Sequence, residues 1–384
     1  MSIALTQKQK QNYITYIDLL SSVINKTNPP KLSENVNWRF IFKKAEHNSV
    51  LNLIGYTLDK VNVKPSEDLY AEMANRRNFE ILKETSQLHT TDLLLREFDR
   101  LNIDNLPLKG YFMKQYYPQS DFRTMGDVDI LIDRKHFKKL DDIFTKLGFE
   151  NAGVIKSSEM HFKKDFMYFE IHSDLNENDD NYYDDIWNRV KLRNDYKNSY
   201  EMTLEDFYIY LIYHAGKHFT RGGIGIRMVM DIYVFLKKYE DLNMSYIDDE
   251  LKKMELYAFE KKLRSTAFNW FSDEKTVIDE LGEFILYCST FGKRKVAFYQ
   301  SGKKTGGAYW IKQVFIPYKT MRSKYNYLNK APALLPFSWV QLWFTRIFIK
   351  RDLNLKHGFS DRVSNLDEKD AKFMDNLMND LELH

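Results

Sequence analysis

The sequence predicts an α+β fold, in which a small mixed β-sheet lies between an N-terminal and a C-terminal helical region. Residues 8–98 carry apolar side chains at helical spacing, and residues 103–172 contain several short apolar runs of strand length. Helical spacing returns after Thr203. The 384 residues, 43% of them hydrophobic, are enough for a packed core. The expected domains are 1–102, 103–200 and 201–384.

The N-terminal region is expected to consist of helices. Residues 13–23 place Tyr, Ile, Leu and Val on one helical face, and no breaker interrupts the run from Leu69 to Leu101, which predicts one long helix. Ser66, followed by two acidic residues, is typical of a helix start.

The central region alternates between strand-like and helical segments. A short strand over 105–108 ends in the Lys109-Gly110 turn, and an amphipathic helix over 136–147 begins after Asp133, a candidate cap. This alternation indicates a mixed sheet with helices on one face. The other expected elements are a helix over 111–117 and strands near 127–132, 152–155, 160–163 and 166–172.

Helices are expected again after Thr203-Leu-Glu-Asp206, which loosely matches a capping box. The first of them is expected to end at His218 or Phe219. Others are expected over 226–239, 246–254, 257–271 and 275–290.

The C-terminal part is basic and aromatic. Residues 293–356 contain many Lys and Arg but one acidic residue, Asp352. Such a surface is either simply solvated or attracts an anionic partner, for example a nucleic acid, a membrane or a phosphorylated acceptor. The aromatic segment 331–350 is expected to be a helix on the core, with a membrane-interface helix or a partner-binding face as alternatives.

The composition limits the cellular compartments in which the protein is expected. The net charge is +3, and the single cysteine, Cys288, excludes an internal disulfide and suits a reducing compartment. The N-terminus lacks the apolar core of a signal peptide, and no uninterrupted apolar stretch is long enough to span a membrane. A cytoplasmic location is therefore expected.

Paired carboxylates indicate the chemistry. Asp127 and Asp129 are two residues apart on a predicted strand, so both side chains leave it on the same side. Burying two unpaired carboxylates is costly, and a divalent cation such as Mg²⁺ resolves that conflict. Glu170 ends another apolar run and is the candidate third carboxylate, with Asp174 as its alternative. The pattern indicates metal-dependent phosphoryl or nucleotidyl transfer.

Several histidines and ion pairs accompany these carboxylates. His172 shares a strand face with Glu170 and is either a proton shuttle, an acceptor contact or a structural histidine. His214 and His218 share a helix face; their spacing can bind zinc, but a role in lining a cleft is favoured because no Glu follows His214. Arg227-x-x-x-Asp231 is either a helix-stabilising ion pair or part of the cleft.

Taken together, these motifs resemble the polymerase-β-like nucleotidyltransferase superfamily, and especially a bacterial group of uncharacterised nucleotidyltransferase family proteins. There are two departures: Lys109-Gly110 stands where the superfamily often has Gly-Ser, and Ser173 stands where close relatives often carry an aromatic residue. The motifs are Leu108-Lys109-Gly110, Tyr117-Pro118, Arg123 to Asp129, Glu170-Ile-His172, His214 to His218 and Arg227 to Asp231.

The resemblance implies an enzyme that moves a nucleoside monophosphate from an NTP such as ATP to an acceptor, releasing pyrophosphate. The metal ligands for Mg²⁺ or Mn²⁺ would be Asp127, Asp129 and Glu170. The NTP would contact Lys109, Gly110, Arg123, Gly126 and Lys217, although Lys109 alternatively pairs with the Asp cluster when nucleotide is absent. The acceptor side would include His172, His214, His218 and Arg227.

The acceptor is left open by these residues: a small molecule, a glycan intermediate, a protein or an RNA end all fit. Two other functions also remain. One is a catalytically weak nucleotide-binding or scaffold protein in a biosynthetic pathway, which the intact carboxylates disfavour. The other is a template-independent RNA-modifying nucleotidyltransferase, which the basic C-terminal part permits.

Overall fold

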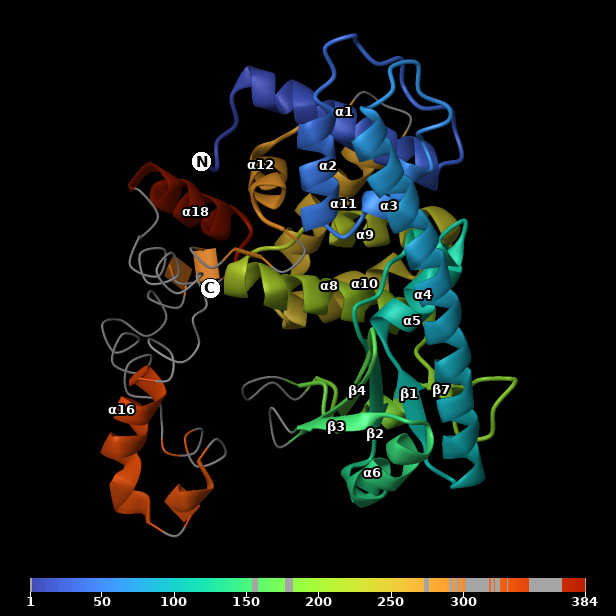
Figure 1. The fold of residues 1–384 in the computed structure, drawn as a ribbon, viewed down its shortest axis with the longest axis vertical. Helices are drawn as coiled ribbons and strands as arrows, with labels where there is room; N and C mark the ends of the chain where they lie inside the picture. Colours follow the sequence, from blue (N-terminus) through green and yellow to red (C-terminus); the bar gives the residue numbers. More distant parts are fainter. Residues whose placement is uncertain are drawn as a thin grey trace.

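The fold of the chain, taken from a computed structural model, is α+β, as predicted, with a small mixed sheet beside a larger group of helices (Figure 1). The structure describes residues 2–153, 158–176, 182–272, 276–289, 292–293, 296–297, 299–300, 318, 321, 325–329, 331–344 and 368–383.

The N-terminal region is helical. The apolar face expected over 13–23 lies in α1, which a capping box at Thr6 begins. The long helix expected from Leu69 to Leu101 is confirmed as α4, with Ser66 at its N-cap, and α4 extends alongside the sheet (Figure 1). The helices are α1 Gln7–Ile24, α2 Trp38–His47, α3 Leu51–Gly55 and α4 Glu67–Arg100.

The main sheet has the strand order β1-β2-β5-β4-β3. β2 and β5 run parallel, and the other neighbouring strands run antiparallel, so the sheet is mixed, as predicted. Its strands are β1 Asn105–Pro107, β2 Val128–Ile132, β3 Glu150–Gly153, β4 Glu159–Lys164 and β5 Met167–His172. α5 Lys109–Tyr116 follows β1, and η1 Ser120–Phe122 precedes β2.

One face of the sheet packs on α6 Phe137–Lys146. The Phe144 ring stacks on Phe162 of β4 at 3.8 Å and contacts Phe169 of β5 edge-on at 5.5 Å. Burial alternates along β5, so Glu170 and His172 project from the opposite face. Asp133 caps the short η2 turn, Arg134–His136, which leads into α6, and its carboxylate accepts a bond from the Lys135 amide at 2.9 Å.

The remaining helices begin after Thr203, whose hydroxyl accepts a bond from the Asp206 amide and caps α8, as predicted. α8 extends beyond its predicted end and stops where Gly223 adopts a φ of 95°, which favours glycine. The elements are α7 Ile186–Arg189, β6 Lys191–Leu192, β7 Tyr200–Glu201, α8 Leu204–Gly222, α9 Ile226–Lys238, α10 Met244–Lys253, α11 Tyr257–Phe271, α12 Glu280–Tyr287, η3 Asn326–Asn329, η4 Pro332–Leu334, α16 Leu335–Phe344 and α18 Glu368–Asp380.

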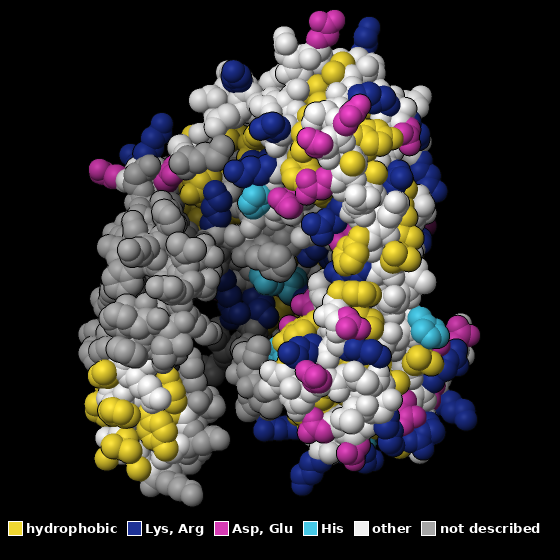
Figure 2. All heavy atoms as spheres, viewed as in Figure 1, with side chains coloured by type: hydrophobic (Ala, Val, Ile, Leu, Met, Phe, Trp, Pro, Cys, Tyr) yellow, Lys and Arg dark blue, Asp and Glu magenta, His cyan; other side chains and the backbone are white. Residues whose placement is uncertain are grey.

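The aromatic segment 331–350 contains α16, and residues 345–350 lie outside the described part of the chain. Among the described residues, α16 is not found packed on the main core as expected. Its Leu335 and Trp339 instead border a separate small cluster around Met321 and Leu328. Apolar side chains of this segment face outward (Figure 2), and Phe337 is 62% exposed. Most of the basic stretch lies outside the described residues. Among the described helices, none has the length and apolar character needed to cross a membrane.

The stacking of Phe144 yields a stability prediction. Phe144→Ala removes the ring that packs under β4 and β5 and leaves a cavity, so it should lower the free energy of unfolding by about 3–5 kcal/mol in urea titrations. Phe79→Ala, at a site that is 41% exposed, is the matched control and should cost less than about 1 kcal/mol. Equal costs would contradict the packing described.

A buried lysine on α5 yields a second prediction. Lys114 is 1% exposed, and burial lowers its pKa to about 8, although Glu84 partly opposes the shift. Below pH 8, both the folded and the unfolded chain hold the proton, and burying the charge costs roughly 3 kcal/mol. Between pH 8 and about 10.5, the unfolded chain binds more protons, so this cost declines as pH rises.

Lys114→Met should therefore be more stable than the parent below pH 8, and the difference should shrink as pH approaches 10. Chemical denaturation at several pH values measures it. Lys252→Met, at an exposed lysine of α10, should show no such pH dependence. A stability difference that is constant from pH 7 to 10 would mean that Lys114 keeps an ordinary pKa.

Candidate functional site

Strand pairing brings polar side chains together on the sheet face opposite α6. Asp129 of β2 lies in register with Glu170 of β5, and paired residues of parallel neighbours point to the same side. His172 is two residues further along β5. Across the antiparallel β4–β5 pair, His161 lies opposite Glu170 and Glu159 lies opposite His172. Three neighbouring strands therefore contribute titratable groups to one face.

Three of these residues, Asp129, Glu170 and His172, form what we call the carboxylate–histidine cluster. The Nε2 atom of His172 lies 3.1 Å from Oδ1 of Asp129 and 3.9 Å from Oε2 of Glu170. One ligand atom from each residue lies within 4.8 Å of the other two. Near the centre of the face shown in Figure 2, His, Asp/Glu and Lys/Arg side chains lie close together.

Lys109 and Asp127 flank this cluster. Lys109 begins α5, and its Nζ lies 3.3 Å from Oδ2 of Asp129. In this structure, Lys109 therefore pairs with the aspartates, which was the alternative to binding phosphate. Asp127 is half-buried and directly precedes β2. Burial and the neighbouring charge of Asp129 raise the pKa of Asp127. The charges of the two aspartates therefore influence each other, whereas the prediction that both side chains leave the strand on the same side stays a prediction.

The carboxylates repel one another, and the neighbouring positive charge offsets only part of this repulsion. Burial disfavours charge on Asp129, but the Lys109 ammonium and the His172 imidazole outweigh it and hold the Asp129 pKa below its usual range. Burial, followed by the charges of Asp129 and Asp127, raises the pKa of Glu170 to about 7. The negative charge exceeds what Lys109 offsets. Carboxylate oxygens and an imidazole nitrogen are ligands for divalent cations, so these residues fit such an ion.

The two candidate glycines differ in their surroundings. Gly110 is buried in the first turn of α5, and an added Cβ would meet the Met125 sulfur at 2.9 Å, so a larger residue there would displace the Met125 side chain. Gly126 is exposed, and nothing lies within 4 Å of the place where its Cβ would be. The space beside Gly126, next to Asp127, is therefore open.

Arg123 is held inside the protein by Asp231 of α9. Its Nε donates to Oδ1 at 2.7 Å and its Nη2 donates to Oδ2 at 2.8 Å, while the Tyr117 hydroxyl donates to Oδ1 at 2.8 Å. Its Nη1 donates to the Thr124 carbonyl. The guanidinium therefore serves the fold, and its predicted contact with phosphate stays a prediction.

The ion pair considered between Arg227 and Asp231 is replaced by this arrangement. The described partners of Asp231 are Arg123 and Tyr117, and Arg227 donates to the Thr124 hydroxyl at 3.2 Å. Burial, followed by the charge of Arg123, lowers the Arg227 pKa to about 10, while Asp231 and Asp127 oppose the shift. Arg227 thus lies within electrostatic reach of Asp127.

The predicted polar face of α8 also lies near the site. The His214 and His218 rings are 4.4 Å apart, and His214, Lys217 and His218 are half-buried. Burial lowers the His214 pKa well below its usual range, and the Lys109 charge contributes next. That influence places this part of α8 toward the start of α5, which packs against α8. Neither histidine belongs to a three-ligand group among the described residues.

Sequence reasoning missed Glu159 and His161. A signal for them existed: Glu159-Met-His161 repeats the Glu-x-His pattern of Glu170-Ile-His172. Because the two strands are antiparallel, each Glu lies opposite the other strand's His. Asp174, the alternative third carboxylate, lies beyond the end of β5, and its carboxylate accepts a bond from the Asn176 amide.

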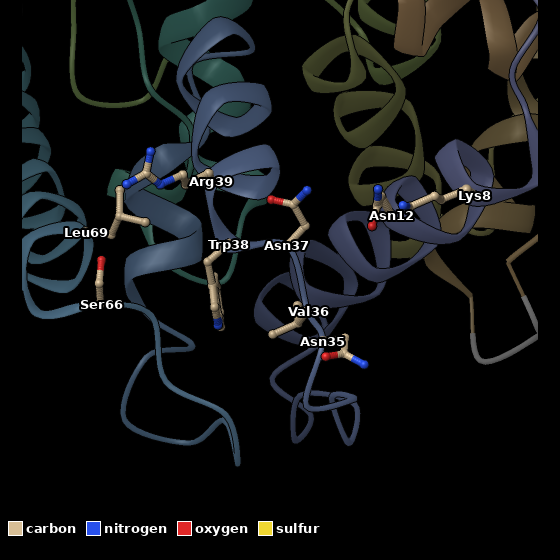
Figure 3. Close-up of a pocket in the computed structure, with 9 residues that line it drawn as sticks. All are labelled: Lys8, Asn12, Asn35, Val36, Asn37, Trp38, Arg39, Ser66 and Leu69. Carbon is tan, nitrogen blue, oxygen red and sulfur yellow. The ribbon is translucent and has the colours of Figure 1, made fainter.

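A separate hollow of about 650 Å³ lies among the N-terminal helices (Figure 3). It is formed by α1, the residues before α2, α2 and the start of α4, and contains none of the carboxylates discussed above. Its lining residues are Lys8, Asn12, Asn35, Val36, Asn37, Trp38, Arg39, Ser66 and Leu69.

Comparison with known proteins gives one family and one structure. Residues 34–272 match the model of a family described as uncharacterised nucleotidyltransferase. No curated protein matches the chain. The chain is similar to the solution structure of the antibiotic-resistance factor ANT(2'')-Ia, with a TM-score of 0.35 and 10% identity over 47% of this chain and 97% of that chain. At this TM-score, the likeness carries no argument about mechanism.

The buried Arg123–Asp231 pair yields a prediction. Asp231→Asn leaves a buried guanidinium without its counter-charge and should lower the free energy of unfolding by about 3–5 kcal/mol. The double variant Arg123→Met/Asp231→Leu should cost less than either single change, because no charge is left unpaired. Arg96→Met, which breaks the exposed pair with Asp92 on α4, is the control and should change stability little. Single variants as stable as the parent would contradict this account.

Proposed function

Because this chain belongs to the uncharacterised nucleotidyltransferase family and is thus a transferase, we propose that it moves a nucleoside monophosphate from an NTP to an acceptor hydroxyl. The acceptor hydroxyl loses its proton to the surrounding water, its oxygen forms a bond to the α-phosphorus, the bond from that phosphorus to the bridging oxygen breaks, and pyrophosphate leaves. The observation that carries the proposal is the register that places Asp129 beside Glu170, with Asp127 next to β2.

The proposed metal ligands are Asp127, Asp129 and Glu170. A divalent cation there, Mg²⁺ or Mn²⁺, would neutralise charge on the triphosphate and polarise the acceptor oxygen. The raised pKa of Glu170, caused by burial and by both aspartates, is the electrostatic support for this assignment. The chain's own part is to hold these carboxylates in fixed positions, with side chains anchored on two paired strands.

The triphosphate would lie between these carboxylates and the basic groups around them. Lys109 is 3.3 Å from Asp129 and would turn to a phosphate oxygen when nucleotide binds. The open space beside Gly126 leaves room for the ligand, and the first turn of α5 at Gly110 offers backbone N–H groups. We place Lys217 of α8 on the same side of the site.

The acceptor would lie toward α8 and α9, which carry His214, His218 and Arg227. Support comes from two electrostatic effects: the charge of Lys109 helps to lower the pKa of His214, and the charge of Asp127 helps to raise the pKa of Arg227. Imidazoles and a half-buried guanidinium suit a polar acceptor more than a hydrophobic one. Small molecules, glycan intermediates, protein hydroxyls and RNA ends share this chemistry.

Calorimetric titration with ATP, GTP, CTP and UTP, in the presence and absence of Mg²⁺, tests the proposal. The parent should bind at least one nucleotide in a Mg²⁺-dependent manner. Asp129→Asn keeps the side-chain shape but removes a charge that faces the metal, so it should weaken Mg²⁺–nucleotide binding by at least about tenfold. Asp127→Asn should act in the same direction.

Asp133→Asn is the matched control, because it removes a carboxylate near the end of β2 while asparagine still caps the following turn. Its nucleotide affinity should equal that of the parent. If Asp129→Asn and Asp133→Asn bind nucleotide equally well, the site is wrongly placed. Metal-dependent binding without pyrophosphate release in the presence of candidate acceptors would favour the scaffold function instead.

A further inference from the structure

We propose that His172 is a direct ligand of the divalent cation, and that it makes the site prefer a first-row transition-metal ion, with Mn²⁺ as the probe, over Mg²⁺. The inference rests on the proposed function, because it concerns the same cation. It changes the ligand set from carboxylates alone to carboxylates plus an imidazole.

The distances within the carboxylate–histidine cluster fit one shared ion. Ligand atoms that each lie about 2.1 Å from an ion are about 3 Å apart when adjacent and about 4 Å apart when opposite. The Nε2 atom of His172 lies 3.1 Å from an Asp129 oxygen and 3.9 Å from a Glu170 oxygen. An ion between these three atoms would replace the proton that His172 and Asp129 share.

The other ring nitrogen of His172 has the surroundings of a metal-binding histidine. A histidine that ligates a metal almost always directs its second ring N–H to a carboxylate, carbonyl or water, which sets the tautomer and the ring orientation. The Nδ1 atom of His172 lies 3.8 Å from Oε1 of Glu159. Glu159 therefore faces the nitrogen that points away from the cluster, and Nε2 remains for the ion.

His161 gives an independent observation at the same place. Its ring is buried, its Nε2 has no hydrogen-bond partner, and that atom lies 3.8 Å from Oε2 of Glu159. Its Nδ1 lies 2.8 Å from the Tyr168 hydroxyl and 3.7 Å from Oε1 of Glu170. His161 therefore has one ring nitrogen near the Glu159 carboxylate and the other near the Glu170 carboxylate. The duplicated Glu-x-His pattern supplies both the imidazole of the cluster and the groups that orient it.

This placement favours metal ligation over the alternative roles of His172. A base for the acceptor needs an imidazole nitrogen that is open to the acceptor. Here, Nε2 lies between two carboxylates and Nδ1 faces a third, and the side chain is 14% exposed. A histidine with a purely structural role needs one hydrogen-bond partner for each ring nitrogen. It does not need two carboxylates, those of Asp129 and Glu170, near the same nitrogen.

The ligand type determines the metal preference. Mg²⁺ selects oxygen ligands and demands near-ideal octahedral geometry, whereas transition-metal ions take imidazole nitrogen readily. Mn²⁺ accepts carboxylate oxygens as well, so it suits a site that combines these carboxylates with one imidazole. Replacing His172 should remove the preference while leaving the carboxylates that Mg²⁺ uses.

The experiment is Mn²⁺ binding by the full-length protein, followed by electron paramagnetic resonance. The parent should bind Mn²⁺ with a dissociation constant at least tenfold lower than that of Mg²⁺, which is measured by competition for the same site. Pulsed measurements on the parent should show the coupling of a directly bound imidazole nitrogen. His172→Gln should lose that coupling and weaken Mn²⁺ binding at least tenfold, while Mg²⁺ binding changes less than threefold.

Two further variants sharpen the result. Glu159→Gln keeps the proposed ligands but alters the group that orients His172, so it should weaken Mn²⁺ binding by about tenfold and retain the nitrogen coupling. His136→Gln, at a histidine of η2 away from the cluster, is the control and should bind Mn²⁺ like the parent.

The outcomes separate this inference from the proposed function. Mg²⁺-dependent nucleotide binding by a parent that shows no nitrogen coupling and no preference for Mn²⁺ would overturn the role of His172 and leave the transferase site intact. If the parent bound neither cation and no nucleotide, both would fall. The coupling is measured on the parent itself, so the inference stays testable even if His172→Gln does not fold.

Discussion

The parallel pairing of β2 with β5 is the constraint around which the site is organised. In-register pairing directs Asp129 and Glu170 to the same side of the sheet, where water screens their charges poorly. Two neighbours offset the resulting repulsion: Lys109 from the turn after β1, and His172 from β5 itself. The compensation is incomplete, because burial and the two aspartates still raise the Glu170 pKa to about 7. The divalent cation proposed above, together with an anionic substrate, would offset that remaining imbalance.

A second interaction holds the segment that leads into β2. Arg123 donates to both carboxylate oxygens of Asp231, and the Tyr117 hydroxyl donates a further bond to the same group. The pair is buried, so the loss of one partner is costly. Through it, α9 anchors the chain just before Asp127. The C-terminal helices therefore do more than surround the sheet: α9 holds the segment before β2 through Asp231 and through Arg227, which donates to the Thr124 hydroxyl.

The two Glu-x-His strands give the site its chemical character. Antiparallel pairing sets Glu159 opposite His172 and His161 opposite Glu170, so carboxylates and imidazoles alternate across the sheet. On the other face, the Phe144, Phe162 and Phe169 rings pack against one another and keep both strands flat against α6. Side-chain alternation along a strand thus divides one short sheet into an aromatic core and a polar face that carries the carboxylate–histidine cluster.

The sequence by itself determined the features that depend on neighbours along the chain. Periodicity indicated the α+β class and the long helix α4, and local cap chemistry indicated Asp133 and Thr203. Only the tertiary structure decided the partners: Glu170 for Asp129, Arg123 rather than Arg227 for Asp231, and Glu159 for His172. The physical reason is that a pattern within one strand or helix describes which side a residue faces, whereas strand register and ion-pair choice are set by packing between segments far apart in the chain.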